Sequence, residues 1–404
     1  MFLKPPIPTA PRLLHPRGIR FLSVAAVIAL AVLSGCVSPD GARENAARVD
    51  LRTIPSIDTV RPLDPAVWSR KAVSYSGFRA GQSPDTGIHP GREEMLEDLR
   101  FLEAEGFGLI RVFSSGEHGR MVVELIDEHG IDIKVQMGAY VSGANTENHA
   151  ENMRELDDAV VLATAFPDII ASVSVGNEVL VSWSFVAVPP ADLIDYVRYV
   201  RARVPQPVTV NDNWEPYAAP PGSDTAAVWG QIDFAAVHTY AYWDAGFELW
   251  DFRQKSVPEA RRARAMMDAA YAYARENFHA VRAALDAAGH PIPIVIGETG
   301  WQSVPSAYLD EAFVKDFAHH QAHPVNQAWY FEDMMAWAYG TDGDDPGDGF
   351  RRPAAMFYFA AFDEPWKERD DNWGLWDADR EPKYVLTSEG YDAEEAVYYR
   401  PMTN

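Results

Sequence analysis

The sequence predicts a (β/α)8 barrel, because eight short apolar segments alternate with segments of helical periodicity along most of the chain. Several apolar segments are rich in the β-branched residues that occupy strands buried on both faces. The expected strands cover residues 72–77, 109–113, 132–140, 169–176, 207–211, 234–239, 292–297 and 355–361. An open doubly wound sheet is the alternative, and it is disfavoured because no glycine-rich phosphate loop follows the first strand.

Helices are expected between these strands because apolar residues recur there at spacings of three and four. In the first of them, Met95, Leu96, Leu99 and Leu102 form one stripe. The expected helices cover residues 93–102, 117–129, 148–165, 190–204, 256–288 and 324–340. The connection 214–231 is rich in Pro and Gly and is expected to be only partly helical.

The first 36 residues resemble an export signal. Four basic residues precede an apolar run from Phe21 to Val32, which is too short to span a bilayer. Leu33–Cys36 resembles the lipobox of bacterial lipoproteins, so Cys36 is the expected lipidation site. Cys36 is also the only cysteine of the chain, and one thiol builds no internal disulfide. A cleaved soluble signal or a buried free cysteine are the alternatives.

The remaining chain is expected to form one barrel on a tether. Residues 37–66 contain Pro and Gly without sustained periodicity, which is typical of a flexible linker. Residues 67–404 have a length that suits one large barrel, although two domains would also fit. Lipid at Cys36 would hold an exported monomer in the bacterial cell envelope, at the outer membrane or the periplasmic face.

The charge balance limits the possible partners. The chain has 35 basic and 59 acidic residues, a formal net charge of −24, which becomes −28 without residues 1–36. Nucleic acids and anionic lipid surfaces need a basic face on their protein partners, so neither is expected as a partner here. The lipid bilayer is expected as a partner only through the acyl chains of the anchor. An acidic exported protein is suited to neutral or cationic material.

Two glutamates stand at the ends of apolar strands. Glu298 ends the run that begins at Ile292, and Glu178 ends the run that begins at Ile169. An unpaired charge is costly to bury, so a strand that ends in a carboxylate suggests a functional role for that carboxylate. If these are strands four and seven of a barrel, the two side chains face each other across its mouth, where barrel enzymes build their sites.

Other strand ends carry the side chains that a sugar site needs. Aromatic rings cover the apolar faces of pyranoses, while amides and charged groups bind the hydroxyls. The candidate substrate-binding residues are Tyr75, Arg111, Asn177, Trp214, Tyr240, Trp243, Trp301, Glu364 and Lys367. Trp214, Trp243 and Trp301 are equally compatible with packing at the barrel top. For a second group packing is favoured: Trp366, Trp373 and Trp376.

Two strand-end glutamates suit the hydrolysis of a glycosidic bond, which needs an acid for the leaving oxygen and a nucleophile or base opposite it. We assign Glu178 as acid/base and Glu298 as nucleophile. A carboxyl separation of roughly 5–5.5 Å would indicate net retention. Asn177 is suited to bind the sugar 2-hydroxyl, and Arg111 and Tyr240 to keep Glu298 ionised and oriented.

No metal site is expected. His319, His320 and His323 lack a second cluster of ligands and favour a solvated loop. Asp342–Gly349 lacks the ligand spacing of an EF-hand loop and is expected to be a surface turn, where weak calcium binding is the alternative.

The motifs around these residues resemble glycoside hydrolase family 17, the retaining β-1,3-glucanases, over about residues 70–384. Val175–Val179 is similar to the acid/base motif of that family and Gly297–Trp301 to its nucleophile motif. Further segments resemble its bacterial branch: Tyr75–Arg79, Gly81–Asp85, Ile110–Ser115, Ala361–Lys367 and Trp373–Trp376. The resemblance implies a β-1,3-glucan substrate, retention by double displacement and no cofactor.

The chain also departs from the plant members of that family. It has Gln302 in place of a usual Pro, a lipobox, and a long segment over residues 243–288. The resemblance therefore predicts a lipid-anchored hydrolase of laminarin-like β-glucans. The alternatives are a β-1,3-glucan glucanosyltransferase and, in another class, a surface lipoprotein that binds glucan without cleaving it.

Overall fold

The protein was analysed as a computed structural model. It describes residues 55–143, 146–305, 321–340, 347–367 and 371–398. The expected lipidation site Cys36, most of the expected tether, and His319 and His320 lie outside the described residues.

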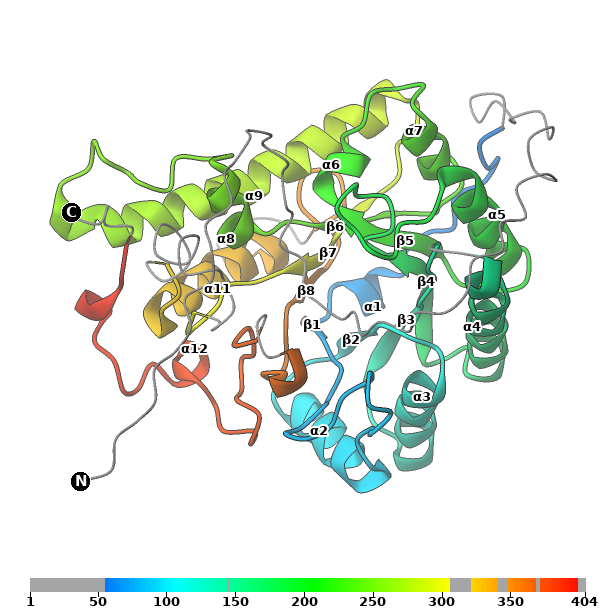
Figure 1. Cartoon of the computed structure of the whole chain (residues 1–404), viewed down its shortest axis with the longest axis horizontal. Helices are drawn as coiled ribbons and strands as arrows, with labels where there is room; N and C mark the ends of the chain where they lie inside the picture. The colour runs from blue at the N-terminus through cyan, green and yellow to red at the C-terminus, as the bar shows by residue number, and fades with distance from the viewer. Residues whose placement is uncertain (1–54, 144–145, 306–320, 341–346, 368–370, 399–404) are drawn as a thin grey trace, which may run out of the picture.

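The core is a closed barrel of eight parallel strands in chain order, which confirms the expected (β/α)8 fold (Figure 1). All eight expected strands are present, and most are shorter than their apolar segments. The strands are β1 Ala72–Ser74, β2 Leu109–Val112, β3 Lys134–Ala139, β4 Ile170–Asn177, β5 Val208–Asn213, β6 Ala235–His238, β7 Ile294–Thr299 and β8 Met356–Tyr358. Each strand pairs with the next, and β8 pairs with β1 through Ala72–Phe357 and Val73–Tyr358.

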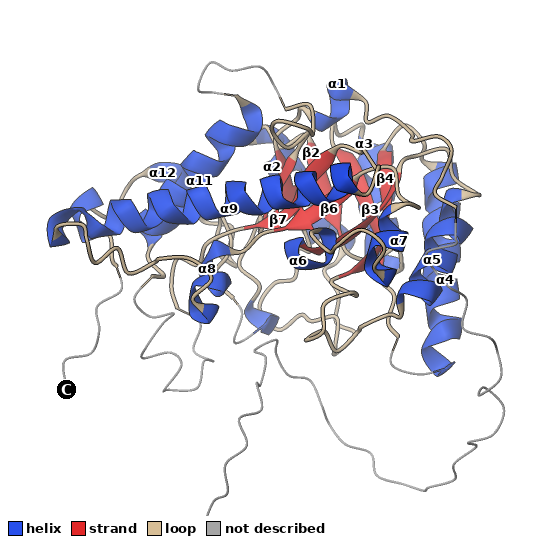
Figure 2. Cartoon of the chain, turned by 90° about the horizontal axis from the view of Figure 1, so that it is seen from above, coloured by secondary structure: helices blue, strands red, loops and turns tan. Residues whose placement is uncertain are grey.

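Helices surround the barrel, and the longest, α9, runs across its outer face (Figures 1 and 2). The longer helices are α2 Arg92–Ala104, α3 Glu117–His129, α4 Thr146–Ala165, α5 Pro190–Arg201, α9 Arg262–Ala287 and α11 Pro324–Tyr339. The short ones are α1 Pro65–Trp68, α6 Trp214–Tyr217, α7 Asp224–Trp229, α8 Ala241–Asp244 and α12 Tyr384–Thr387. The expected partly helical connection 214–231 therefore contains α6 and α7.

An aromatic plug closes the end of the barrel at which the strands begin. Trp68 of α1 packs edge-on against Phe234 and Phe357, with ring centroids 5.0 and 6.3 Å apart. These rings share a cluster with Ala72 and Leu109, the first residues of β1 and β2. The cluster is separate from the main core, and Figure 2 shows α1 on the side of the strands opposite to α8.

The end of the expected tether is docked on the barrel instead of being free. Arg61 donates to the carbonyls of Gln206 and Arg201, each at 2.7 Å, and its backbone N–H donates to Asp233 at 2.7 Å. These partners lie just before β5 and β6, at the base of the barrel. The partly buried hydrogen bonds of Arg61 hold this segment on the barrel, although its low periodicity suggested a linker. Within the described residues, no helix has the length and apolarity needed to cross a membrane.

Candidate active site

A glycine precedes each strand-end glutamate, for different physical reasons. Gly176 has φ +87°, a conformation that side chains rarely adopt, and it turns the end of β4 so that Glu178 leaves the sheet with φ 50°. At Gly297 a Cβ atom would lie 2.4 Å from Asn211 Oδ1, so only glycine permits this close packing. The two glycines position Glu178 and Glu298 at the mouth of the barrel.

Glu298 is buried among groups that stabilise its ionised form. Arg111 donates to Oε1, Tyr240 donates to Oε2 at 2.7 Å, and only 7% of the side chain is exposed. Burial by itself would raise the pKa of this carboxyl. The charges of His238 and Arg111 and the Tyr240 hydrogen bond outweigh burial, so the pKa of Glu298 lies well below its usual range. Glu298 is therefore a carboxylate at neutral pH.

Glu178 has a more open environment. Its side chain is 23% exposed, and its backbone N–H donates to the Asn211 carbonyl at 2.9 Å. Its one hydrogen-bond partner among the described side chains is His238, whose Nδ1 lies 3.1 Å from Oε1. No Arg or Lys side chain among the described residues pairs with Glu178, in contrast to Glu298. The pair therefore combines an enclosed, ionised carboxylate with a second glutamate that is more exposed and faces the cavity.

His238 lies between the two carboxylates, a position that was not assigned from the sequence. It is fully buried at the end of β6, and its Nε2 lies 3.7 Å from Glu298 Oε1 while Nδ1 contacts Glu178. One imidazole ring therefore spans the glutamate pair. The sequence showed only that His238 stands at the end of the sixth strand. Its contact with both glutamates depends on the pairing of β6 with β7, which sets His238 beside Glu298.

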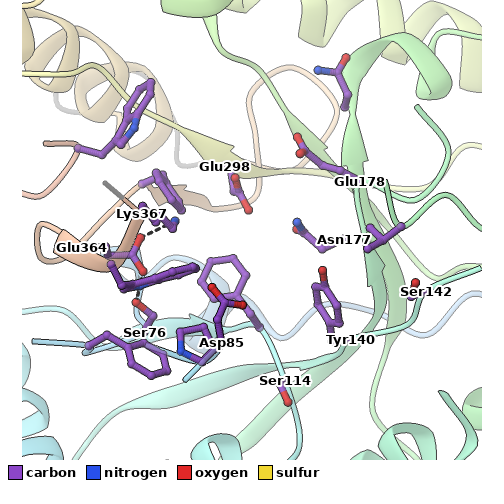
Figure 3. A pocket seen from close by; sticks show the side chains of 18 of the residues that line it. Ser76, Asp85, Ser114, Tyr140, Ser142, Asn177, Glu178, Glu298, Glu364 and Lys367 are labelled. Atoms are coloured by element: carbon purple, nitrogen blue, oxygen red, sulfur yellow. Dashed lines mark hydrogen bonds and ion pairs between the residues drawn. The ribbon is translucent and has the colours of Figure 1, made fainter. Parts of the chain in front are cut away.

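A cavity of about 1240 Å³ opens above the two glutamates (Figure 3). This volume exceeds the range of about 300–1,000 Å³ that is usual for small-molecule pockets, so it has room for several sugar units. Its aromatic lining residues are Phe78, Phe113, Tyr140, Trp183, Tyr240, Trp243, Phe247, Phe359, Trp366 and Trp373. Its acidic lining residues are Asp85, Glu117, Glu151, Glu155, Glu178, Glu215, Asp244, Glu298 and Glu364.

Five of the expected substrate-binding residues line this cavity: Asn177, Tyr240, Trp243, Glu364 and Lys367. Lys367 Nζ lies 2.5 Å from Glu364 Oε2, and Ser76 donates to the other carboxylate oxygen of Glu364. In the view of Figure 3, Lys367 and Glu178 lie on opposite sides of Glu298. These five residues occupy positions from which a sugar can be contacted.

The other four expected substrate-binding residues do not line the cavity. Tyr75 is fully buried and donates to Asp98 at 3.2 Å, and Trp301 is fully buried with its indole N–H on the Gln321 carbonyl at 2.8 Å. Both are packing residues, which corrects the expectation. Trp214 packs against the core and donates to Asp244 at 3.3 Å. Arg111 lies beneath the cavity floor, so it acts on Glu298 and not on substrate.

Arg111 also links the carboxylate to a neighbouring amide. Its second guanidinium nitrogen donates to Asn177 Oδ1, while the first donates to Glu298. This fixes the amide orientation, because Oδ1 must face the guanidinium and the NH₂ group must then point elsewhere. The cavity-lining Asn177 therefore presents a donor to a bound ligand.

Two of the tryptophans for which packing was favoured line the cavity. Trp373 is 3% exposed and packs edge-on against Tyr240 at 5.4 Å, and Trp366 packs against Phe78 at 6.0 Å. Beyond β8, Trp376 pairs with Phe362 in an isolated β-bridge, and this pairing brings the nearby Trp373 back to the mouth. No local sequence pattern shows this return. Trp376 is buried at 1% exposure, as expected.

Nothing in the described residues offers a metal site. They contain no group of three or more His, Cys, Asp or Glu side chains arranged to hold an ion. His323 instead caps α11, where its Nδ1 accepts from the Val325 N–H at 3.2 Å. The rest of the expected histidine loop, and most of Asp342–Gly349, lie outside the described residues.

Known proteins resemble the chain over most of its length. A glucan 1,3-β-glucosidase of Arthroderma benhamiae is 24% identical over 331 residues, which are 78% of this chain and 90% of that protein. The crystal structure of an endo-laminarinase from Formosa Hel1_33_131 matches with a TM-score of 0.68 and 26% identity, over 79% of this chain and 86% of that one.

A more distant structure shares the fold. An active-site mutant of a Rhizomucor miehei β-1,3-glucanosyltransferase in complex with laminaritriose matches with a TM-score of 0.56 and 19% identity, over 79% of this chain and 97% of that one. At this identity the likeness concerns the fold alone.

The family itself is shown by a match over most of the barrel. The model of the BtgE/BtgC glycoside hydrolase domain matches residues 72–375, a range that begins at β1 and ends beyond β8. The resemblance to glycoside hydrolase family 17 is confirmed by this match together with the β-1,3-glucan-directed relatives. The chain is a glycosidase that belongs to the BtgE/BtgC glycoside hydrolase domain family.

Proposed function

We propose that the protein hydrolyses β-1,3-glucosidic bonds of laminarin-like glucans with net retention. The observation that carries this proposal is the ionised, buried Glu298 beside the more exposed Glu178, with one imidazole spanning both, on the floor of an aromatic-lined cavity. The names of the glucosidase and laminarinase relatives support the substrate class.

In the first step, the Glu298 carboxylate attacks the anomeric carbon while Glu178 gives its proton to the glycosidic oxygen. The carbon–oxygen bond to the leaving sugar breaks, and a covalent glycosyl–Glu298 ester forms. In the second step, Glu178 takes a proton from water, the hydroxide oxygen bonds to the anomeric carbon, and Glu298 leaves as a carboxylate. Two inversions at one carbon give net retention.

The groups around Glu298 hold it ready for attack. Arg111 and Tyr240 fix both carboxylate oxygens, and this leaves little freedom to be lost on reaching the transition state. The Asn177 amide is oriented by Arg111 and is positioned to donate toward the sugar 2-hydroxyl, a contact that strengthens as positive charge develops on the ring.

Laminarin hydrolysis by protein lacking residues 1–36 tests the proposal, with the anomer of the first product followed by NMR. We expect β-anomeric products from the wild type and a fall of about 10⁴-fold or more for Glu298→Gln, because an amide is a poor nucleophile. Glu93→Gln is the matched control, since Glu93 is exposed at the start of α2, outside the cavity lining. An active Glu298→Gln variant, or products of the α-anomer, would refute the assignment.

Product length distinguishes hydrolysis from transfer, because the glycosyl–Glu298 ester can react with water or with a sugar. Incubation with laminaritriose should give shorter sugars as the main products. Accumulation of oligosaccharides longer than the substrate would identify the protein as a glucanosyltransferase. Binding of laminarin without any turnover would leave only a glucan-binding lipoprotein.

We further propose that Cys36 carries lipid and anchors the protein in the cell envelope. The basic segment, the apolar run and Leu33–Cys36 support this proposal. In a Gram-negative host, mass spectrometry of the N-terminal peptide should show an acylated Cys36, and Cys36→Ala should release the protein from the membrane fraction. An unmodified Cys36 in membrane-fractionated protein would contradict it.

A further inference from the structure

Asp244 is a carboxylate in the cavity lining that the proposed reaction does not use. It stands at the end of α8, in the segment that follows β6. Trp214 Nε1 and the Tyr273 hydroxyl both donate to the same oxygen, Oδ2, at 3.3 and 3.1 Å. Within the described residues, Oδ1 accepts no hydrogen bond. The side chain is thus held rigidly while one acceptor oxygen is left for a ligand.

The order of the strands places Asp244 on a definite side of the reacting pair. Glu178 follows β4, Asn213 ends β5 and Asp244 follows β6, so these residues share one wall of the barrel mouth. Glu364 and Ser76 follow β8 and β1 and form the opposite wall. Glu298 is the penultimate residue of β7, between the two walls.

The chemistry of double displacement says which half of the substrate lies on each wall. The group that protonates the glycosidic oxygen must stand beside the leaving sugar, whereas the sugar that stays behind is bonded to Glu298. Glu178 lies on the wall of β4 to β6, so the leaving sugar lies along that wall. The retained sugar then extends toward Glu364 and Lys367.

The segment that carries Asp244 also provides an aromatic surface. Trp243 lines the cavity, and its ring packs against Tyr242 at 5.1 Å and Trp373 at 5.9 Å, which fixes its plane. Tyr273, which holds Asp244, belongs to the long helix α9. An oriented ring beside an oriented acceptor is the usual composition of a sugar subsite.

We propose that Asp244 is a substrate-binding residue of the leaving-group subsite, where its Oδ1 accepts a hydrogen bond from a hydroxyl of the first glucosyl unit that departs, beside the ring of Trp243. The proposal rests on the proposed β-glucanase function. It also assigns Trp214, which sequence reasoning placed on the sugar, to the positioning of Asp244. The same contact would orient an incoming sugar when the glycosyl–Glu298 ester reacts by transfer.

Two substrates that differ only in their leaving group test this proposal. Laminaritriose presents a glucosyl unit to the subsite, whereas 4-nitrophenyl β-laminaribioside presents an aryl group without sugar hydroxyls. Asp244→Asn keeps an acceptor for Trp214 and Tyr273 but turns an NH₂ group toward the cavity. We expect kcat/KM to fall about 10- to 100-fold on laminaritriose and less than about threefold on the aryl substrate, since the sugar hydroxyl loses its acceptor and meets an NH₂ group instead.

Controls separate the possible failures. Tyr273→Phe removes one of the donors that hold Oδ2 without touching the cavity lining, and it should give a smaller loss with the same preference for laminaritriose. Asp195→Asn, on the exposed side of α5, should change neither value. Equal losses on both substrates, or none on either, would overturn the proposal. A wild type inactive on both would instead refute the glucanase function itself.

Discussion

Glu178 and Glu298 differ in their surroundings more than in their chemistry. Glu298 is enclosed by a guanidinium, a phenol and an imidazole, whereas Glu178 faces the cavity and contacts only the imidazole among the described side chains. Two identical side chains thus stand in different environments, and the charges around Glu298 hold that carboxyl in its ionised form.

Arg111→Met should move the acidic limb of the pH profile of kcat/KM to higher pH. Arg111 helps to depress the pKa of Glu298, so the nucleophile stays ionised, and activity persists, until the pH falls through that low pKa. Loss of the guanidinium should shift the limb of kcat/KM by about 1–3 pH units toward neutrality. The pH profile on laminari-oligosaccharides measures this. Arg92→Met, at an exposed arginine of α2, is the control.

An unshifted limb with a uniformly lower rate would contradict this prediction. Arg111 would then only position Glu298 and Asn177, without setting the protonation state of Glu298.

Asp212→Asn should change how stability depends on pH. Burial raises the pKa of Asp212 from 3.8 to about 7, aided by the charge of Glu178, so ionisation of this carboxyl destabilises the folded protein. In the wild type that cost is absent below about pH 4, grows as the pH rises, and is complete above about pH 7. The free energy of unfolding of the variant minus that of the wild type should therefore increase from pH 4 to 7.

Urea unfolding across this range measures the difference. The variant also carries a constant cost, because an amide cannot accept both the Leu180 and the Asn213 backbone hydrogen bonds. Parallel stability curves would show that Asp212 does not titrate in this range.

At the residue scale, the sequence predicted correctly where Glu178 and Glu298 lie, because that follows from position along one strand. A charge at the end of a buried strand is visible in the sequence, and both glutamates have that signature. The role of Asp244 was not visible, because Trp214 and Tyr273 reach it from two other elements. Trp301 was expected to bind substrate and Trp373 to pack, but Trp373 lines the cavity and Trp301 is buried. Packing between distant segments decides which ring faces the cavity.

At the scale of elements, five of the eight strands, β1 and β8 above all, are shorter than the apolar segments that predicted them. β1 ends at Ser74 and β8 at Tyr358, although both segments run three residues further. Residues beyond these ends leave the ladder and turn toward the mouth, so Ser76 and Glu364 reach the cavity. Apolar pattern alone cannot locate the point at which a strand stops pairing, because the residues on both sides of that point remain buried.

Trp68→Ala should destabilise the fold without changing catalysis. The ring fills the base of the barrel against Phe234 and Phe357, and its removal leaves a cavity that costs about 3–5 kcal/mol. We expect a lower urea midpoint, with KM and kcat on laminarin unchanged at temperatures where the variant is folded. A changed KM with unchanged stability would contradict the separation of base and mouth.

At the scale of the whole molecule, the barrel has two unlike ends. The mouth carries the glutamate pair and a largely acidic and aromatic lining, while the base is closed by Trp68 and covered by residues 55–66. The closed order of eight strands was predictable from alternation along the chain. The docking of residues 55–66 was not, because Arg61 binds backbone carbonyls, which leave no trace in the sequence.

Truncation should reveal this docking. A protein that begins at Pro55 keeps the Arg61 contacts, whereas one that begins at Asp64 loses them but retains α1 and its cap. The shorter protein should melt several degrees lower, because the Gln206 and Arg201 carbonyls lose their charged donor. Activity on laminarin should be equal at low temperature. Identical melting temperatures would show that residues 55–63 contribute no stability.

The docked segment also separates the start of the described chain from the mouth, because the two lie at opposite ends of the barrel. The proposed lipid at Cys36 would therefore connect to the barrel from the side of its base, which lies opposite the mouth. Such an attachment would leave the mouth open to glucan chains that arrive from solution, because the attachment and the substrate would use opposite ends of the barrel.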